Sequence, residues 1–343
     1  MLWTRGDAVA TGAFDAWFFA LADPALGSPP PPCPPPLDAA ELCELADWHG
    51  VLPAVGRNLR RFAPADARVT VVLGVAHDRL VRRVAFSLVL RKQLEGVSAA
   101  LTAARIPALV IKGAEFADRL YPEPSLRPFT DLDLLLPRDA LGDAGAAIAH
   151  LGYRRDPNPS GKHRDDYGEE TWRLDAPGTG ALELHWNLVN SPPLRRRCSV
   201  ELRDLALESP GGGAPAPATP PRATAGSLLL IAAVHAAMSH RFDRLQPLAD
   251  TLQAARGAAG AVDRAWLAEA ANRTGSAFAL ATALRLAGAI FREPACAQLG
   301  AAVRPRGDGW LARILVTPRT VLRPKGLAAG IRRQLFRECL KRL

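Results

Sequence analysis

The chain has 343 residues, 48% of them hydrophobic and 22% charged, which excludes wholesale disorder and allows two or three domains with sizeable cores. The formal charge is +9 at pH 7, and arginine far outnumbers lysine. This excess fits either the codon usage of a GC-rich genome or a basic surface for phosphates, nucleotides or an acidic partner.

Five cysteines are scattered along the chain and form no CxxC pair. A disulfide framework or a zinc site needs closer, paired spacing, so we expect reduced thiols in a reducing compartment. The apolar stretch Phe14–Ala22 contains Asp15 and lacks the layout of a signal peptide, and no run of about 18 apolar residues occurs. We therefore expect a cytoplasmic protein without stable membrane insertion.

Helical periodicity dominates the first 105 residues. The proline run Pro29–Pro36 must be extended, because proline lacks an amide donor and has a fixed φ. Residues 38–62 then carry apolar side chains at helical spacing, and residues 80–103 place Val84, Leu88 and Leu94 on one helical stripe. These patterns predict a helical N-terminal region, residues 1–105.

The pattern changes at Ile106-Pro107. Short apolar runs separated by turn residues and helical stretches indicate an α/β unit over residues 106–207. The predicted strands are residues 108–111, 131–136, a strand beginning at Gly152-Tyr153, and residues 171–174 and 181–189. The predicted helices are residues 114–120 and 138–150.

A second Pro/Gly-rich stretch, Ser209–Pro221, indicates a linker over residues 208–224. Beyond it the chain is helical in pattern, which predicts a helical C-terminal domain, residues 225–343. Its predicted helices are residues 226–240, 245–256, 264–272 and 276–291. The expected fold class is therefore α+β, a central mixed β-sheet core flanked by helical regions.

Three carboxylates carry the strongest chemical signal. Asp131 and Asp133 alternate with leucines on one predicted strand, so both point to the same face, about 7 Å apart. Glu183 alternates with Leu182 and Leu184 on a later strand. Carboxylates on one face repel unless a cation compensates them, and hard cations such as Mg²⁺ prefer carboxylate and phosphate oxygens. An isolated DxD pair is, however, also common at solvated strand ends.

Lys112-Gly113 lies between a predicted strand and a predicted helix. Glycine allows close approach of the backbone to a phosphate, and the following helix N-terminus favours an anion. Together with the carboxylates, this unit predicts a phosphate cradle that faces a metal site.

The ordered motifs resemble those of a family of bacterial nucleotidyltransferases, distant relatives of the DNA polymerase β-type superfamily. They are Leu109–Ala114, Tyr121-Pro122, Arg127-Pro128, Asp131–Leu135, Gly152-Tyr153 and Leu182–Trp186, with weaker likeness at Ala46–Val51, His235, His240, Arg244-Leu245 and Asp250. The resemblance implies a nucleotidyltransferase core in which Asp131 and Asp133 bind Mg²⁺ (or Mn²⁺). Glu183 takes the place of the third carboxylate, which helps to activate the attacking hydroxyl.

One departure concerns the phosphate-binding motif. The wider superfamily usually has Gly-Ser before its DxD, whereas this chain has Lys112-Gly113 and a longer insert before Asp131. Lys112 is therefore a candidate to neutralise a phosphate directly, and the identity of the donor stays open.

Secondary candidates for substrate or nucleotide binding are Arg127, Thr130, His185 and Asp250. Each has a structural alternative: Arg127 as a loop anchor, Thr130 as a cap, His185 as a hydrogen-bond partner and Asp250 as a packing contact. His235 and His240 have i, i+5 spacing, which suits buried structural histidines better than metal ligands. The basic segment Arg319–Leu343 is either a partner-binding helix or an ordinary helix with a solvated face.

The leading functional prediction is an enzyme that moves a nucleotidyl group from an NTP to a hydroxyl or phosphate on a small molecule or peptide. One alternative uses a nucleotide-sugar or another activated phosphate donor. A second alternative is a non-catalytic nucleotide-binding protein. Nucleic acid is a conceivable but unfavoured partner, because nothing beyond general basicity resembles a nucleic-acid-binding module.

Overall fold

The computed structural model describes residues 8–34, 37–157, 166–208, 220–303, 310–323 and 326–342. Residues 209–219, most of the predicted linker, and residues 35–36, the end of the proline run, lie outside the described residues.

Four helices precede the sheet: α1 (Ala8–Leu21), α2 (Ala39–Trp48), α3 (Leu52–Phe62) and α4 (Ala67–Ala103). The predicted helical stretch 38–62 is divided because Gly50, with φ of 71°, ends α2. α4 begins after its N-cap Asp66, well before the periodic stretch that predicted a helix from residue 80. The first half of α4 also carries exposed valines, such as Val71 and Val75, so its apolar residues are not confined to one helical face.

The sheet has five strands in the order β1-β2-β5-β4-β3. β2 and β5 are parallel neighbours, and the other three pairs are antiparallel, so the sheet is mixed as predicted. The strands are β1 (Leu109–Val110), β2 (Asp131–Leu135), β3 (Tyr153–Arg155), β4 (Glu169–Leu174) and β5 (Ala181–His185). The connecting elements are α5 (Gly113–Leu120), η1 (Pro124–Leu126), η2 (Arg138–Ala140) and α6 (Leu141–Ala149).

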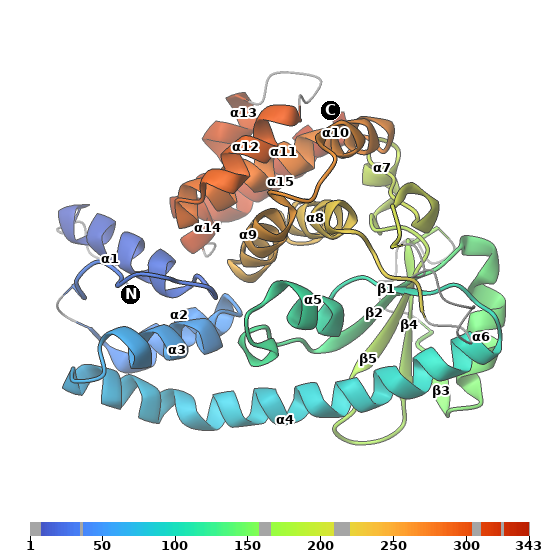
Figure 1. Ribbon diagram of the computed structural model, residues 1–343, viewed down its shortest axis with the longest axis horizontal. Helices are drawn as coiled ribbons and strands as arrows, with labels where there is room; N and C mark the ends of the chain where they lie inside the picture. The colour runs from blue at the N-terminus through green and yellow to red at the C-terminus, as the bar shows by residue number, and fades with distance from the viewer. Residues whose placement is uncertain are drawn as a thin grey trace.

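One face of the sheet is apolar and packs against α4 and α6. Figure 1 shows α4 running along this side of the strands. The buried cluster contains Leu132, Leu134, Leu182 and Leu184 from the strands, with Leu90 and Val97 from α4 and Ile148 from α6. Because side chains alternate along a strand, the residues between these leucines point to the opposite face, toward the C-terminal helices.

The elements after β5 are almost all helical. They are α7 (Pro192–Arg195), η3 (Leu202–Asp204), α8 (Ala225–Val234), a π-helical segment η4 (His235–Ser239), α9 (Gln246–Ala258), α10 (Arg264–Arg273), α11 (Ala277–Phe291), α12 (Pro294–Ala302), α13 (Trp310–Leu315), α14 (Pro318–Leu322) and α15 (Leu327–Arg342). Their large core also takes in Trp17 and Phe18 of α1. The hydrophobic packing therefore joins the N-terminal helices to the C-terminal ones. Among the described helices, none has the length and apolar character that crossing a bilayer requires.

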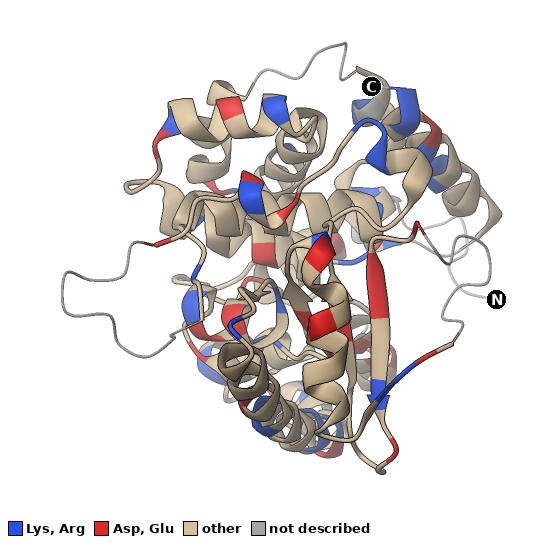
Figure 2. Cartoon of the chain, turned by 90° about the vertical axis from the view of Figure 1, so that its right-hand side faces the viewer, with Lys and Arg blue, Asp and Glu red and all other residues tan. Residues whose placement is uncertain are grey.

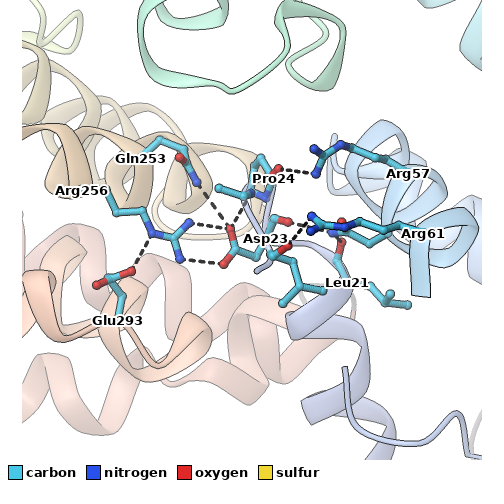
Figure 3. Close-up of polar contacts among 11 residues, drawn as sticks. Leu21, Asp23, Pro24, Arg57, Arg61, Gln253, Arg256 and Glu293 are labelled. Carbon is cyan, nitrogen blue, oxygen red and sulfur yellow. Dashed lines mark hydrogen bonds and ion pairs between the residues drawn. The ribbon is translucent and has the colours of Figure 1, made fainter. Parts of the chain in front are cut away.

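Asp23, just after α1, joins the two helical regions through polar contacts (Figure 3). Both of its carboxylate oxygens accept from Arg256 of α9 at 2.7 Å, and Arg256 also donates to Glu293 at 2.6 Å. On the other side, Asn58 of α3 donates to the carbonyl of Asp23 at 2.8 Å. The segment after α1 is thus fixed between α3 and the C-terminal helices.

Candidate active site

The polar face of the sheet brings the predicted carboxylates together. β2 and β5 are in register with Asp133 opposite Glu183, and Asp131 lies two residues before Asp133 on the same face. His185 follows Glu183 on that face, beside Leu135. Figure 2 shows Asp, Glu, Lys and Arg positions distributed along the strands and helices on this side of the molecule.

Asp133 is the centre of this group and is almost fully buried, with 2% exposure. Its Oδ1 lies 2.6 Å from Nζ of Lys112 and 3.0 Å from Nε2 of His185. Burial alone would raise the pKa of Asp133, but the charges of Lys112 and His185 hold it well below its usual range. Asp133 is therefore ionised at neutral pH.

Lys112 reaches this carboxylate because of the turn between β1 and α5. Gly113 begins α5 with φ of 50°, a conformation that favours glycine. A Cβ at Gly113 would make ordinary contacts, 3.4 Å from the ring of Phe129 and 3.5 Å from the carbonyl of Asp131, so the backbone conformation is what favours glycine here. Burial lowers the pKa of Lys112, but Asp133, Asp131 and Glu183 outweigh burial and raise it, so the ammonium stays charged.

His185 bridges three carboxylates. Its Nε2 lies 3.0 Å from Asp133 and 3.5 Å from Glu183, and its Nδ1 lies 3.3 Å from Oε2 of Glu169. Burial would lower its pKa, but the acceptors Asp133 and Glu183 and the charge of Glu169 raise it to about 10. The imidazole is therefore a second internal cation beside Lys112.

Glu169 is a site residue that sequence reasoning missed. It lies on β4 in register with His185, two positions before the predicted start of that strand. Burial, and the charges of Glu183 and Asp133, raise the pKa of Glu169 to about 7 against the attraction of His185. The predicted strand begins at Thr171. If its alternation is extended two residues toward the N-terminus, Glu169 falls on the same face as Thr171, and this is the signal that could identify it.

The site contains more carboxylates than cationic side chains. Four carboxylates, Asp131, Asp133, Glu169 and Glu183, face two cations, Lys112 and His185. The charge of Asp133, followed by burial, raises the pKa of Asp131 to about 6. This unbalanced negative charge is what a divalent cation would neutralise, and carboxylate oxygens are the ligands that Mg²⁺ and Mn²⁺ prefer.

The residues present fit a metal ion. Ligand atoms of Asp133, Glu183 and His185 lie within 4.8 Å of one another. This group shares Asp133 and Glu183 with the predicted ligand set and adds His185. Asp131 lies on the same face at the start of β2, where it is only partly buried. Thr130 precedes it and is exposed.

Arg127, which follows η1 in the α/β unit, and Asp250, on α9, lie side by side. Nε and Nη2 of Arg127 each donate to one carboxylate oxygen of Asp250 at 2.8 Å, and the Tyr121 hydroxyl donates to the same carboxylate at 2.7 Å. Arg127 also donates to the carbonyl of Gly113 at 3.2 Å. Arg127 and Asp250 are 5% and 1% exposed. The pair therefore fixes the Lys112-Gly113 turn against the helical domain.

His235 and His240 lie closer together than α-helical spacing would allow. The π-helical segment η4 places their rings perpendicular with centroids 4.7 Å apart. Burial of the ring and the charge of Lys112 hold the pKa of His235 well below its usual value, so the imidazole is neutral. η4 thus brings a neutral histidine to the side of the site opposite the sheet.

Comparison with known proteins gives one family. The profile of a family described as an uncharacterised nucleotidyltransferase matches residues 35–292, three quarters of the chain, which span the sheet and its polar face. No curated protein and no solved structure matches the chain significantly. The predicted membership of a nucleotidyltransferase family is confirmed, as is the α+β fold with its mixed sheet. The chain belongs to this nucleotidyltransferase family.

Proposed function

We propose that this transferase depends on a divalent metal and moves a nucleotidyl group from an NTP to a hydroxyl or phosphate of a small molecule or peptide. The observation that carries the proposal is the position of Asp131, Asp133 and Glu183 on one sheet face beside the Lys112-Gly113 turn. A metal site next to a phosphate cradle is the combination that nucleotidyl transfer requires.

Asp131, Asp133 and Glu183 would hold Mg²⁺ or Mn²⁺, with His185 as a further ligand or as their hydrogen-bond partner. The metal would supply charge neutralisation at the donor phosphates and would polarise the oxygen that attacks. Asp133 suits this role because its pKa is held low, so it stays a carboxylate. Asp131, with a pKa of about 6, ionises as the pH approaches neutrality.

The step we propose is in-line attack on the α-phosphorus of the donor. The acceptor oxygen forms a new O–P bond, the bond from the α-phosphorus to the bridging oxygen breaks, and pyrophosphate leaves with the electron pair. Glu183, which is partly exposed, accepts the proton of an acceptor hydroxyl. Positioning of the reactants supplies much of the rate enhancement in such transfers.

Lys112 and Gly113 bind the donor phosphates in this proposal. The ammonium of Lys112 would neutralise a phosphate, and the backbone at Gly113 lets a phosphate approach the first turn of α5. Thr130, exposed beside Asp131, donates a hydrogen bond from its hydroxyl to the nucleotide. Arg127 and Asp250 act by positioning: Asp250 holds the guanidinium of Arg127, and Arg127 holds the Gly113 carbonyl.

The test is calorimetric titration of ATP, GTP, CTP, UTP and a nucleotide-sugar into the protein, with and without Mg²⁺. Wild type is compared with Asp131→Asn/Asp133→Asn, and the control is Asp139→Asn/Asp143→Asn, in which both residues lie outside the site near α6. We expect one NTP to bind only with the metal, and this binding to be lost in the first double variant alone. Metal-independent binding of a nucleotide, retained in both double variants, would contradict the proposed catalytic site.

A further inference from the structure

A cavity of about 360 Å³ lies between the end of α7 and the turn that joins α10 to α11. Four arginines line it, Arg195, Arg196, Arg197 and Arg273, and the described lining residues include no Asp or Glu. The volume lies within the range of small-molecule sites. Such a concentration of guanidinium groups attracts an anion, and phosphate matches their planar donor geometry.

The arginine segment is held firmly against the neighbouring turn. Gly275 has φ of 70°, and a Cβ at this position would lie 1.8 Å from the carbonyl oxygen of Arg197. The amide of Ser199 donates to the carbonyl of Thr274 at 2.9 Å. Close backbone contact thus joins α7 to the α10–α11 turn and fixes the walls of the cavity.

The four arginines differ in their own contacts. Arg195 is committed to the fold, because it donates to the carbonyls of Val189 and Asn190 at 2.9 and 2.8 Å and lies over the ring of Trp186. Arg273 lies 3.7 Å from Asp204. Arg196 and Arg197 are exposed, and no acidic side chain pairs with either within the described parts of the chain. These two guanidinium groups are therefore available to a ligand.

The cavity adjoins the extension of β5. Nδ2 of Asn187 donates to the hydroxyl of Ser199 at 2.7 Å, and Ser199 lines the cavity. Asn187 follows His185 by two residues, so the chain that leaves the carboxylate site passes directly to the cavity wall. The cavity wall is therefore joined to the chain two residues beyond the strand that carries Glu183.

We propose that this cavity binds a phosphate monoester group of the acceptor, an assignment that rests on the proposed function for the acceptor's role. Arg196 and Arg197 supply the main charge, and the first turn of α11 adds a weaker attraction for the same anion. The cavity is bounded by two turns and is small, which suits a phosphorylated small molecule better than an extended nucleic acid. The nucleotide donor binds separately, at the carboxylates.

The experiment titrates inorganic phosphate into metal-free protein and follows binding by ³¹P NMR. Wild type is compared with Arg196→Gln/Arg197→Gln and with the control Arg60→Gln/Arg82→Gln, which removes the same charge from exposed positions on α3 and α4. We expect about a tenfold loss of phosphate affinity in the first double variant only. Equal loss in the control, or no binding by wild type, would overturn the proposal.

Two further measurements separate this site from others. Lys112→Gln removes the cation of the donor site: if this variant, rather than Arg196→Gln/Arg197→Gln, abolishes the binding of inorganic phosphate, the phosphate lies at the donor site and the proposal is overturned. The second probe is a single-stranded 12-nucleotide DNA. If it binds more tightly than phosphate, and if Arg196→Gln/Arg197→Gln abolishes that binding, the small-molecule assignment is overturned. Because no metal or NTP is present, these outcomes are independent of the NTP titrations that test the proposed function.

Discussion

The ammonium of Lys112 lies 2.6 Å from Oδ1 of Asp133, and both side chains are nearly buried, with 12% and 2% exposure. The same oxygen also lies 3.0 Å from Nε2 of His185. Two side-chain cations thus occupy the position at which a metal would neutralise Asp133. Without a metal, Lys112 and His185 keep the carboxylates together. In the proposed function, a metal bound to Asp133 would release Lys112 to pair with a phosphate of the donor.

Lys112→Met is expected to strengthen metal binding by the nucleotide-free protein about tenfold, because a competing cation is removed from Asp133. It is also expected to weaken NTP binding, because a phosphate loses its counter-charge. Calorimetric titration of Mn²⁺ alone, then of NTP with Mn²⁺, measures both effects. The control Lys92→Met removes an exposed lysine paired with Glu95 on α4 and should change neither. Unchanged Mn²⁺ affinity in Lys112→Met would show that Lys112 and the metal do not compete.

Asp131→Asn is expected to stabilise the metal-free protein at pH 7. The folded-state pKa of Asp131, about 6, lies above its ordinary value of 3.8. Folding is therefore favoured while Asp131 is protonated, and this stability is lost as pH rises from about 4 through 6. Asparagine removes the cost of ionisation, a gain of about 3 kcal/mol at pH 7 and less than about 1 kcal/mol at pH 4.

Urea unfolding in the presence of a chelator, at pH 4 and pH 7, measures this difference. Asp139→Asn, at an exposed position in η2, is the control and should show no such pH-dependent gain. If Asp131→Asn is destabilised at pH 7 in the absence of metal, the repulsion between Asp131 and Asp133 is compensated in some other way.

The chemistry of the site was largely readable from the sequence because strands alternate. Alternation alone indicated that Asp131 and Asp133 share a face and that Glu183 belongs to a polar face. It cannot indicate register, and the pairing of Asp133 with Glu183 depends on the parallel contact between β2 and β5. Glu169 was missed because Glu169-Glu170 breaks the apolar alternation that marks a strand.

Contacts between distant segments could not be predicted. Arg127 and Asp250 are separated by 123 residues, and each on its own was equally consistent with substrate binding and with anchoring. The spacing of His235 and His240 indicated separate faces of an α-helix, but the π-helical segment η4 turns the two rings together. Such a local change in helix type depends on packing, which periodicity does not encode.

The Arg127–Asp250 pair is expected to be essential for stability. Arg127→Met or Asp250→Asn leaves a charged partner buried without compensation, at a cost of about 3 to 5 kcal/mol. Arg127→Met/Asp250→Asn should cost less than the sum of the single changes, because neither charge is left unpaired. Denaturant unfolding of the four proteins gives the coupling energy. The control cycle uses Arg57 and Glu123, a more exposed pair expected to contribute less than about 1 kcal/mol. Additive effects at Arg127 and Asp250 would contradict a coupled positioning role.

Glu169→Gln is expected to lower the pKa of His185 by about 1, because the carboxylate 3.3 Å from Nδ1 favours the imidazolium. The effect should appear only above pH 7, near which Glu169 itself ionises. NMR titration of the histidine side chains, with His185→Gln to assign the resonance, measures it. Glu170→Gln is the matched control: Glu170 is the next residue but points to the opposite face of β4, where it pairs with Arg155. An equal change in both variants would mean that the general charge of the strand governs His185. A change in Glu169→Gln alone identifies Glu169 as a residue that, together with Asp133 and Glu183, favours the imidazolium form of His185.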